Sequence, residues 1–248
     1  MYGEMKYEQV MSKVSLLHGD CLELMKDIPA KSIDMILCDL PYGTTQNKWD
    51  TVIPFEPMWE QYKRIIKDNG AIVLTASQPF TSALVMSNVK MFKYAWVWHK
   101  TRFSNQMLAK YQPLKIHEDV LVFSNKTHNY YPQGLVKFGK ITKQGKKVTD
   151  NIGGGERKTE YFQEWTNYPK TVQVFSHETG LHPTQKPVAL MEYLIKTYTN
   201  EGDTVLDNCM GSGTTGVACK KLNRNFIGME MDDKYFEIAT NRINGKNE

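Results

Sequence analysis

Residues 207–216 read DNCMGSGTTG and end in the glycine pattern Gly211-x-Gly213-x-x-Gly216. An apolar run at 204–206 precedes them, and a segment with helical spacing follows them to about residue 222. A second apolar run, 226–229, ends at Glu230, 19 residues after Gly211. A glycine loop between a strand and a helix, with an acid at the end of the next strand, is the arrangement that binds nucleotide cofactors. The stretch therefore predicts an α/β fold with a cofactor loop, and the plainer alternative is a tight turn that packs a helix on a strand.

The position of this loop near the end of the chain indicates where the rest of the sheet comes from. After Gly216 the sequence predicts only one more strand, 226–229, and a helix that Asp232 caps and that runs to residue 243. One such unit cannot make a sheet, so the other strands must lie upstream. Apolar runs typical of buried strands occur at 14–17, 33–38, 71–76, 94–98 and 120–123.

Helical patterns alternate with these strands. One helix is expected around Trp59 and Tyr62 and to end at Asn69-Gly70, another at 79–88, and a third to begin at Pro187. Strands and helices in alternation predict a mostly parallel sheet covered on both faces. The strand before the glycine loop should be central, with 33–38 beside it, so that both carboxyl ends meet at one crevice.

The alternation breaks between residues 126 and 181. This segment has no regular hydrophobic period and contains the run Gly153-Gly154-Gly155. A loop of that length without structure is unusual inside a compact domain, so we expect an insertion with a small fold of its own. The predicted division is a core domain of residues 1–125 and 182–248 and an insertion of residues 126–181.

Basic residues concentrate in 98–149, which holds ten of them against two acids, although the net charge of the chain is only +4. The remainder is therefore acidic overall, and a basic stretch in such a protein points to a polyanionic partner. The four cysteines form no Cys-x-x-Cys pair and no zinc spacing, so they are expected to be reduced thiols of a cytoplasmic protein without a metal site. No window approaches the ~18 apolar residues of a membrane span, and the polar start does not resemble a signal peptide, so no membrane is expected.

The corner Asp39-Leu40-Pro41-Tyr42 follows the strand predicted at 33–38. Pro41 holds Leu40 extended, so the Leu40 carbonyl and the Asp39 carboxylate point the same way. Both groups accept hydrogen bonds, and an exocyclic amino group offers two N–H donors. Tyr42 supplies a flat face on which a base can stack. Next to a cofactor loop the corner predicts a site for an aromatic amine; on its own it is a turn with a surface Asp39 and a packed Tyr42.

Three motifs and their order along the chain resemble one enzyme family. Asp39-Leu40-Pro41-Tyr42 resembles the D-P-P-Y motif of amino-group DNA methyltransferases, and residues 208–214 resemble their S-adenosylmethionine loop. His182-Pro183-Thr184-Gln185-Lys186-Pro187 resembles the segment that precedes that loop. With the catalytic motif first and the cofactor loop last, the chain is identified as a member of the β class of these enzymes. The resemblance implies a Rossmann-like methyltransferase fold with circularly permuted motif order and S-adenosylmethionine as cofactor.

The resemblance also implies a role for each matching residue. The catalytic residues would be Asp39, Leu40, Pro41 and Tyr42. The cofactor residues would be Asp20, Cys21, Asp39, Thr184, Lys186, Asp207, Cys209, Gly211, Ser212, Gly213, Thr214 and Glu230. Among them Glu230 would take the ribose hydroxyls, Asp207 would line the methionine part, and Lys186 would help hold its carboxylate. A helix cap at Asp20 and a solvated Lys186 are the plainer alternatives.

Leu40 stands where the family usually has proline, but it keeps the backbone carbonyl that matters there. Aspartate at the first position is typical of adenine-N6 enzymes, and serine is commoner in cytosine-N4 enzymes. The expected reaction is therefore methyl transfer to the N6 amino group of an adenine flipped out of double-stranded DNA, with N4 of cytosine as the alternative. More distant alternatives are a nicotinamide-dependent oxidoreductase, a DNA-binding module without catalysis, and transfer to RNA or protein.

In such an enzyme we expect the insertion 126–181 to recognise the DNA target. Candidate DNA contacts come from the basic stretch and this insertion. They are Arg102, Lys137, Lys140, Lys143, Lys146, Lys147 and Arg157, with the lysines on phosphates and the two arginines on bases. Phe103 or Tyr111 could fill the stack left by a flipped base, but both are expected to be core residues. A second copy of the chain and a cognate restriction enzyme are partners compatible with this role, and the sequence decides neither.

Overall fold

The computed structural model describes residues 13–44, 50–143, 160–178 and 185–246. By their contacts the residues form two compact units, one of Met1–Tyr131 with Thr171–Glu248 and the other of Pro132–Lys170. Within the described residues, no helix has the length and apolar character needed to cross a bilayer.

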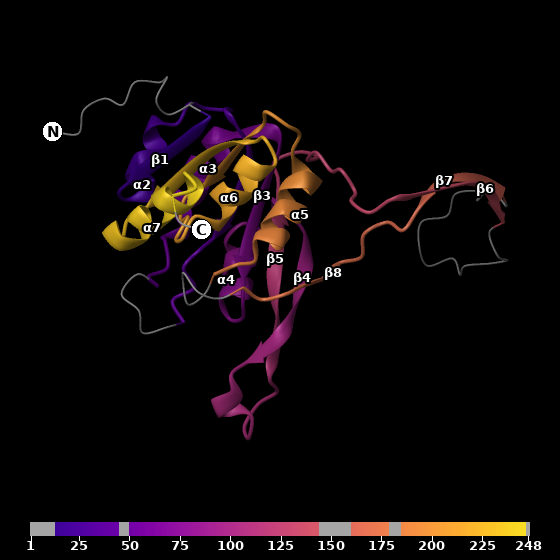
Figure 1. The fold of residues 1–248 in the computed structure, drawn as a ribbon, viewed down its shortest axis with the longest axis horizontal. Helices are drawn as coiled ribbons and strands as arrows, with labels where there is room; N and C mark the ends of the chain where they lie inside the picture. Colours follow the sequence, from indigo (N-terminus) through magenta and orange to yellow (C-terminus); the bar gives the residue numbers. More distant parts are fainter. Residues whose placement is uncertain (1–12, 45–49, 144–159, 179–184, 247–248) are drawn as a thin grey trace. The chain divides into compact units, whose positions relative to one another are not determined.

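The larger unit contains one sheet of eight strands in the order β1-β10-β9-β2-β3-β5-β4-β8 (Figure 1). The strands are β1 (Val14–His18), β2 (Ile33–Asp39), β3 (Ile66–Ala76), β4 (Phe92–Ser104), β5 (Lys115–Phe123), β8 (Val172–Phe175), β9 (Thr204–Asp207) and β10 (Asn225–Glu230). β5 is antiparallel to both of its neighbours, and the other pairs are parallel. The prediction of a mostly parallel sheet is confirmed.

The strand before the glycine loop lies inside the sheet, as its place in the chain predicted. β9 pairs with β10 on one side and with β2 on the other, where Ile36 lies opposite Leu206. Because β2 and β9 are parallel, their carboxyl ends bring Asp39 and Asp207 to the same edge of the sheet. That edge is where a doubly wound sheet binds ligands.

Helices cover both faces of the sheet. They are α2 (Cys21–Leu24), α3 (Phe55–Ile65), α4 (Phe80–Ser87), α5 (Val188–Tyr198), α6 (Thr214–Lys221) and α7 (Asp233–Ile243), with the 3-10 turns η1 (Met25–Asp27) and η2 (Gln106–Leu108). Successive residues of β2 enter opposite clusters, because side chains alternate along a strand. Ile36 packs in the cluster of α3 and α4, and Leu37 packs in the cluster of α5, α6 and α7.

The predicted end of the first long helix at Asn69-Gly70 is wrong. α3 ends at Ile65 and β3 begins at Ile66, so Asn69-Gly70 lies within the strand. The pairing of β2 with β3 shifts register between Ile33 and Met35, which accommodates these residues as an irregularity. A Cβ at position 70 would lie 2.8 Å from the Asp34 carbonyl oxygen, so the glycine permits a close backbone approach there.

The segment 126–181 does not form one separate body. β8 belongs to the main sheet, where it pairs in parallel with β4. In the described part of the smaller unit, 132–170, the strands β6 (Val136–Lys143) and β7 (Glu160–Thr166) pair antiparallel. The expected independent fold is therefore a two-stranded hairpin with narrower bounds than the sequence indicated.

Candidate active site

A cavity of about 830 Å³ opens at the carboxyl edge of the sheet in the larger unit. All four residues of the Asp39–Tyr42 corner line it. So do these residues predicted for the cofactor: Asp20, Cys21, Lys186, Asp207, Cys209, Gly211, Ser212, Thr214 and Glu230. Gly213 does not line the cavity but caps α6, and Thr184 lies outside the described residues. The structure thus brings both predicted halves of the site to one cavity.

The glycine loop turns through left-handed backbone at Gly211 (φ 50°) and Gly213 (φ 79°), conformations that favour glycine. The Glu230 carboxylate accepts hydrogen bonds from the backbone N–H groups of Gly211 and Asp232, both at 2.9 Å. Nothing lies within 4 Å of a Cβ built on Gly211, so the backbone there is open to close approach by a ligand. The loop and Glu230 therefore form one shaped wall of the cavity.

Arg242 of α7 supports this loop, and sequence reasoning did not find it. Its guanidinium donates to the Ser212 carbonyl at 3.1 Å and to the Thr214 hydroxyl at 3.0 Å. Arginine in the last turn of a helix has no motif signal, because only the packing of α7 against the loop gives it a role.

Asp207 is a buried carboxyl group at the end of β9. It accepts a hydrogen bond from the Cys209 backbone N–H at 3.2 Å. Burial raises the pKa of Asp207 to about 7, and it also raises the pKa of the nearby Cys38 thiol to about 12. A cationic group entering the cavity would favour the ionised form of Asp207.

Asp20 is both a cavity residue and a helix cap. Its carboxylate accepts a hydrogen bond from the Leu22 N–H at 2.7 Å and so caps α2. Asp20 therefore has both predicted roles open to it: it caps a helix, and it lines the cavity.

The Asp39 carboxylate is held by three side chains. Its Oδ1 accepts hydrogen bonds from the Tyr42 hydroxyl at 2.9 Å and from the Thr75 hydroxyl. Its Oδ2 accepts from the Lys186 ammonium at 2.6 Å. Thr75 lies opposite Asp39 in the pairing of β2 with β3, so the strand register itself positions this contact. The Tyr42 ring stacks on Phe80, with centroids 5.2 Å apart.

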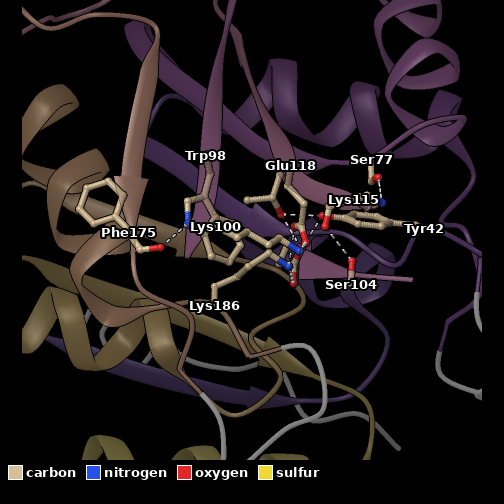
Figure 2. Close-up of polar contacts among 11 residues, drawn as sticks. Tyr42, Ser77, Trp98, Lys100, Ser104, Lys115, Glu118, Phe175 and Lys186 are labelled. Carbon is tan, nitrogen blue, oxygen red and sulfur yellow. Dashed lines mark hydrogen bonds and ion pairs between the residues drawn. The ribbon is translucent and has the colours of Figure 1, made fainter. Parts of the chain in front are cut away.

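A chain of buried charges leads away from Asp39 (Figure 2). The Lys186 ammonium also lies 3.4 Å from Glu118 Oε2, and Lys100 forms an ion pair with the other oxygen of Glu118. The three side chains are 6%, 12% and 11% exposed. Burial opposes the charge on Glu118, but the ammonium groups of Lys186 and Lys100 outweigh it and lower its pKa.

Lys186 therefore contacts the proposed catalytic carboxylate, a contact that sequence reasoning missed. Sequence reasoning also missed Thr75, Lys100 and Glu118. No local pattern signals Thr75, Lys100 and Glu118, because they lie on three strands, β3, β4 and β5, and come together only when those strands pair. Among the residues that the structure describes, no three His, Cys, Asp or Glu side chains gather as ligands for a metal.

The candidate DNA contacts fall on both units. Arg102 is exposed on β4, and Lys137, Lys140 and Lys143 are exposed on β6 of the smaller unit. Lys143 lies 3.5 Å from the Glu160 carboxylate. The candidates Lys146, Lys147 and Arg157 lie outside the described residues.

Phe103 and Tyr111 are not core residues, so that expectation is wrong. Their exposed fractions are 51% and 85%. Both belong to the hairpin between β4 and β5, which runs past the helix-covered part of the sheet, so no helix is available to bury them.

Comparison with known proteins agrees with this geometry. The profile of the DNA methylase family matches residues 33–241. The chain belongs to the DNA methylase family. The type II methyltransferase M.HpaI of Haemophilus parainfluenzae is 30% identical over 93% of this chain and 74% of its own length. The DNA adenine methyltransferase YhdJ of Escherichia coli (strain K12) is 28% identical over 92% of this chain and 82% of its own length.

Solved structures of family members share the fold. The complex of M1.HpyAVI with SAM superposes with a TM-score of 0.65 at 27% identity, covering 93% of this chain and 99% of that one. The cytosine-N4-specific PvuII DNA methyltransferase superposes with a TM-score of 0.67 at 17% identity, covering 94% and 87%. At that identity the second likeness shows the fold alone, so the fold does not separate adenine from cytosine. The predicted Rossmann-like methyltransferase fold is confirmed.

Proposed function

We propose that this member of the DNA methylase family transfers a methyl group from S-adenosylmethionine to the N6 amino group of adenine in double-stranded DNA. The observation that carries the proposal is a single cavity that is lined both by the Asp39–Tyr42 corner and by the glycine loop that follows β9. Adenine is favoured over cytosine because Asp39 begins the corner and because the relative YhdJ is named a DNA adenine methyltransferase.

The residues of the cavity fit this cofactor. Gly211 leaves its backbone open, Glu230 offers carboxylate oxygens suited to ribose hydroxyls, and Asp207 is a buried acid suited to an ammonium group. When bound, the cofactor supplies a methyl group on a positively charged sulfur.

The corner would hold the amino group of the target base. A base inside a duplex cannot enter the cavity, so it must be extruded first. Oδ1 of Asp39 already accepts from Tyr42 and Thr75, but Oδ2 accepts only from Lys186 and retains a lone pair, so Oδ2 and the Leu40 carbonyl accept the two amino hydrogens. Thr75, Tyr42 and Lys186 fix the carboxylate, so that the nitrogen is held in one orientation near attack distance. The carboxylate can then take the proton that the methylated nitrogen releases.

The insertion 126–181 remains our proposal for target recognition. The exposed lysines of β6 support it, because phosphate contacts orient a protein on duplex DNA. A cytoplasmic site of action is supported by the four free cysteines. A cognate restriction enzyme is supported by relatives named type II methyltransferases, and a homodimer remains a prediction.

The direct test is mass spectrometry of nucleosides from DNA incubated with the protein and S-adenosylmethionine. DNA amplified in vitro carries no prior methylation and serves as substrate. We expect N6-methyladenine with the wild-type chain and at least about 10²-fold less with Asp39→Ala after the same incubation. N4-methylcytosine alone would reassign the base, and no methylated nucleoside would contradict the proposal. Thermal stabilisation by a nicotinamide cofactor but not by S-adenosylmethionine would favour an oxidoreductase.

A further inference from the structure

The hairpin that joins β4 to β5, residues 99–117, extends beyond the main sheet as an arm (Figure 1). We call it the β4–β5 arm. It belongs to the same compact unit as the cavity. Every residue from 101 to 114 is exposed, so most of the surface of the arm is open to a partner.

The tip of this arm carries large apolar side chains in solvent. Met107 is 96% exposed and Tyr111 is 85% exposed, and the residues beside them are also open: Phe103 at 51%, Leu108 at 45% and Leu114 at 38%. A cluster of exposed apolar side chains on a projecting element is typical of an interaction surface.

The charge of the arm indicates what kind of partner it fits. Between His99 and His117 the sequence contains no acidic residue, and its cations Arg102 and Lys110 are exposed, whereas Lys100 is buried against Glu118 and Lys115 lines the cavity. Two copies of such a surface would repel each other, whereas a polyanion complements it. Apolar side chains set among cations suit duplex DNA, which offers phosphates outside and flat bases inside.

The arm lines the cavity where β4 ends and β5 begins, and Figure 2 shows the polar contacts of Ser104 and Lys115 there. Ser104, Asn105 and Lys115 line the cavity. The Lys115 ammonium donates to the Ser77 hydroxyl, and the Ser104 hydroxyl donates to the Lys115 carbonyl at 3.3 Å. Part of the arm therefore lies where an extruded base would enter the cavity, and the hydrogen bond from Lys115 to Ser77 holds it there.

We propose that the β4–β5 arm docks on duplex DNA beside the target base, with Tyr111 and Met107 occupying the space in the stack from which that base is extruded and Arg102 and Lys110 on the flanking phosphates. This inference rests on the proposed function. Extruding a base leaves its neighbours unstacked, and an inserted apolar side chain offsets part of that loss. The arm thus couples DNA binding to delivery of the base into the cavity.

The test compares the wild-type protein with the double variant Met107→Ser/Tyr111→Ser. Target sites are first mapped by sequencing in-vitro-amplified DNA that the wild type has methylated. Two short duplexes are then made, one fully paired and one with an abasic site opposite the target base. On the paired duplex we expect the variant to lose about 5- to 50-fold in turnover. On the second duplex, where the base is already unpaired, the loss should shrink to about twofold or less.

Three controls make the outcome decisive. Met86→Ala alters a side chain of α4 that is 73% exposed and should leave both rates unchanged. Binding of S-adenosylmethionine by the Met107/Tyr111 variant should equal that of the wild type. Sedimentation of the wild type and of the Met107/Tyr111 variant shows whether the arm joins two copies of the chain.

Equal rates for the variant and the wild type on the paired duplex would overturn the proposal. So would equal losses on both duplexes, or a wild-type dimer that the variant converts to monomers, since the arm would then serve two copies of the chain. Absence of transfer by the wild type would instead refute the proposed function, so the two failures are distinguishable.

Discussion

Asp39 and Glu230 are both acids at strand ends, but their contacts separate their roles. Asp39 is held by side chains of the corner and by Lys186, while Glu230 binds the N–H groups that shape the glycine loop. We expect Asp39→Ala to lower the rate of transfer by about 10²–10⁴-fold and to leave affinity for S-adenosylmethionine nearly unchanged. Glu230→Ala should weaken that affinity by about 10- to 100-fold, because a charged acceptor is lost. Titration calorimetry of both variants measures the affinities, and an equal loss in both would mean that the two halves of the cavity are misassigned.

Asp207 predicts a pH dependence of cofactor binding. Its pKa is raised to about 7 by burial, so below that pH the folded protein holds it largely neutral. A cationic ligand group needs the ionised form, so binding below pH 7 must first release a proton. Affinity for S-adenosylmethionine should therefore fall by up to about tenfold per pH unit between pH 7 and 5.5. The amino group of the cofactor stays protonated there, and Asp207→Asn should bind weakly with no such slope. A slope that persists in Asp207→Asn would assign the proton to another group.

Glu118 predicts a pH-dependent contribution to stability. Despite its burial, Lys186 and Lys100 lower its pKa below the ordinary value of 4.5. A carboxyl group with a lowered pKa stabilises the fold above its unfolded pKa, and this stability is lost as the pH falls through the folded value. Glu118→Gln leaves the buried Lys100 ammonium without its carboxylate partner and leaves Lys186 with Asp39 alone, so the free energy of unfolding should drop by about 3–5 kcal/mol at pH 7.

Urea unfolding at pH 7 and near pH 4 checks this expectation. The gap between Glu118→Gln and the wild type should narrow at the lower pH. The matched control is Glu23→Gln, which removes an exposed pair with Lys26 and should change stability by less than about 1 kcal/mol. A gap of equal size at both pH values would show that the carboxylate charge is not what stabilises the cluster.

At the scale of elements, Gly216 sets how closely α6 approaches α7 and β10. A Cβ there would lie 2.4 Å from Ile243 Cδ1 and 2.7 Å from the Phe226 ring. Gly216→Ala should therefore reduce the free energy of unfolding by about 1–3 kcal/mol. In an Ile243→Ala background the same change should cost less, because one of the two obstacles is gone. Denaturant titration of the four proteins measures the coupling, and purely additive costs would place the strain elsewhere.

The strands of the core could be predicted because each is a nearly continuous apolar run that no other element explains. β2 shows this, since five of its seven residues are buried. The helix end predicted at Asn69-Gly70 was wrong because this pair commonly ends helices. Here it lies in β3, where the register with β2 shifts and the glycine permits a close approach of the two backbones. β8 is four residues long and half exposed, so its pairing with β4 leaves no local trace.

The residues of the site also fall into those that the sequence could predict and those that it could not. Asp39 and Glu230 could be predicted because each ends a strand, and Gly211 because it lies in the loop that follows β9; parallel strands end together. Thr75 and Glu118 could not, since their contacts depend on which strands pair and in what register. The sequence predicted Lys186 as a site residue but not its contact with Asp39. The exposure of Tyr111 also escaped prediction, because apolar character alone does not distinguish a core residue from one on a projecting arm.

Across the whole molecule, two basic surfaces lie on different units. The β4–β5 arm carries four cations and no acid. The described part of the smaller unit carries Lys137, Lys140, Lys143 and Lys170 together with Glu160 and Glu164. Over its full sequence, residues 132–170, the unit has eight basic and four acidic residues, a net charge of +4 that equals that of the arm. The two surfaces differ in their exposed cations: Lys100 of the arm is buried against Glu118, whereas Lys137, Lys140 and Lys143 are exposed and, within the described residues, only Lys143 lies near an acid, Glu160.

This difference gives a prediction about salt. Each phosphate contact releases counterions, so the logarithm of the affinity for duplex DNA falls with the logarithm of salt concentration by about 0.9 per contact. Arg102→Ala/Lys110→Ala should flatten that slope by up to about 2 units, and Lys137→Ala/Lys140→Ala/Lys143→Ala by up to about 3. If both surfaces lie on the same duplex, the two reductions add in the fivefold variant. Lys63→Ala/Lys90→Ala, which changes exposed lysines elsewhere, should leave the slope unchanged. Salt titrations of the four proteins and the wild type decide the matter, because a slope that only one of the two sets alters would confine DNA binding to that unit.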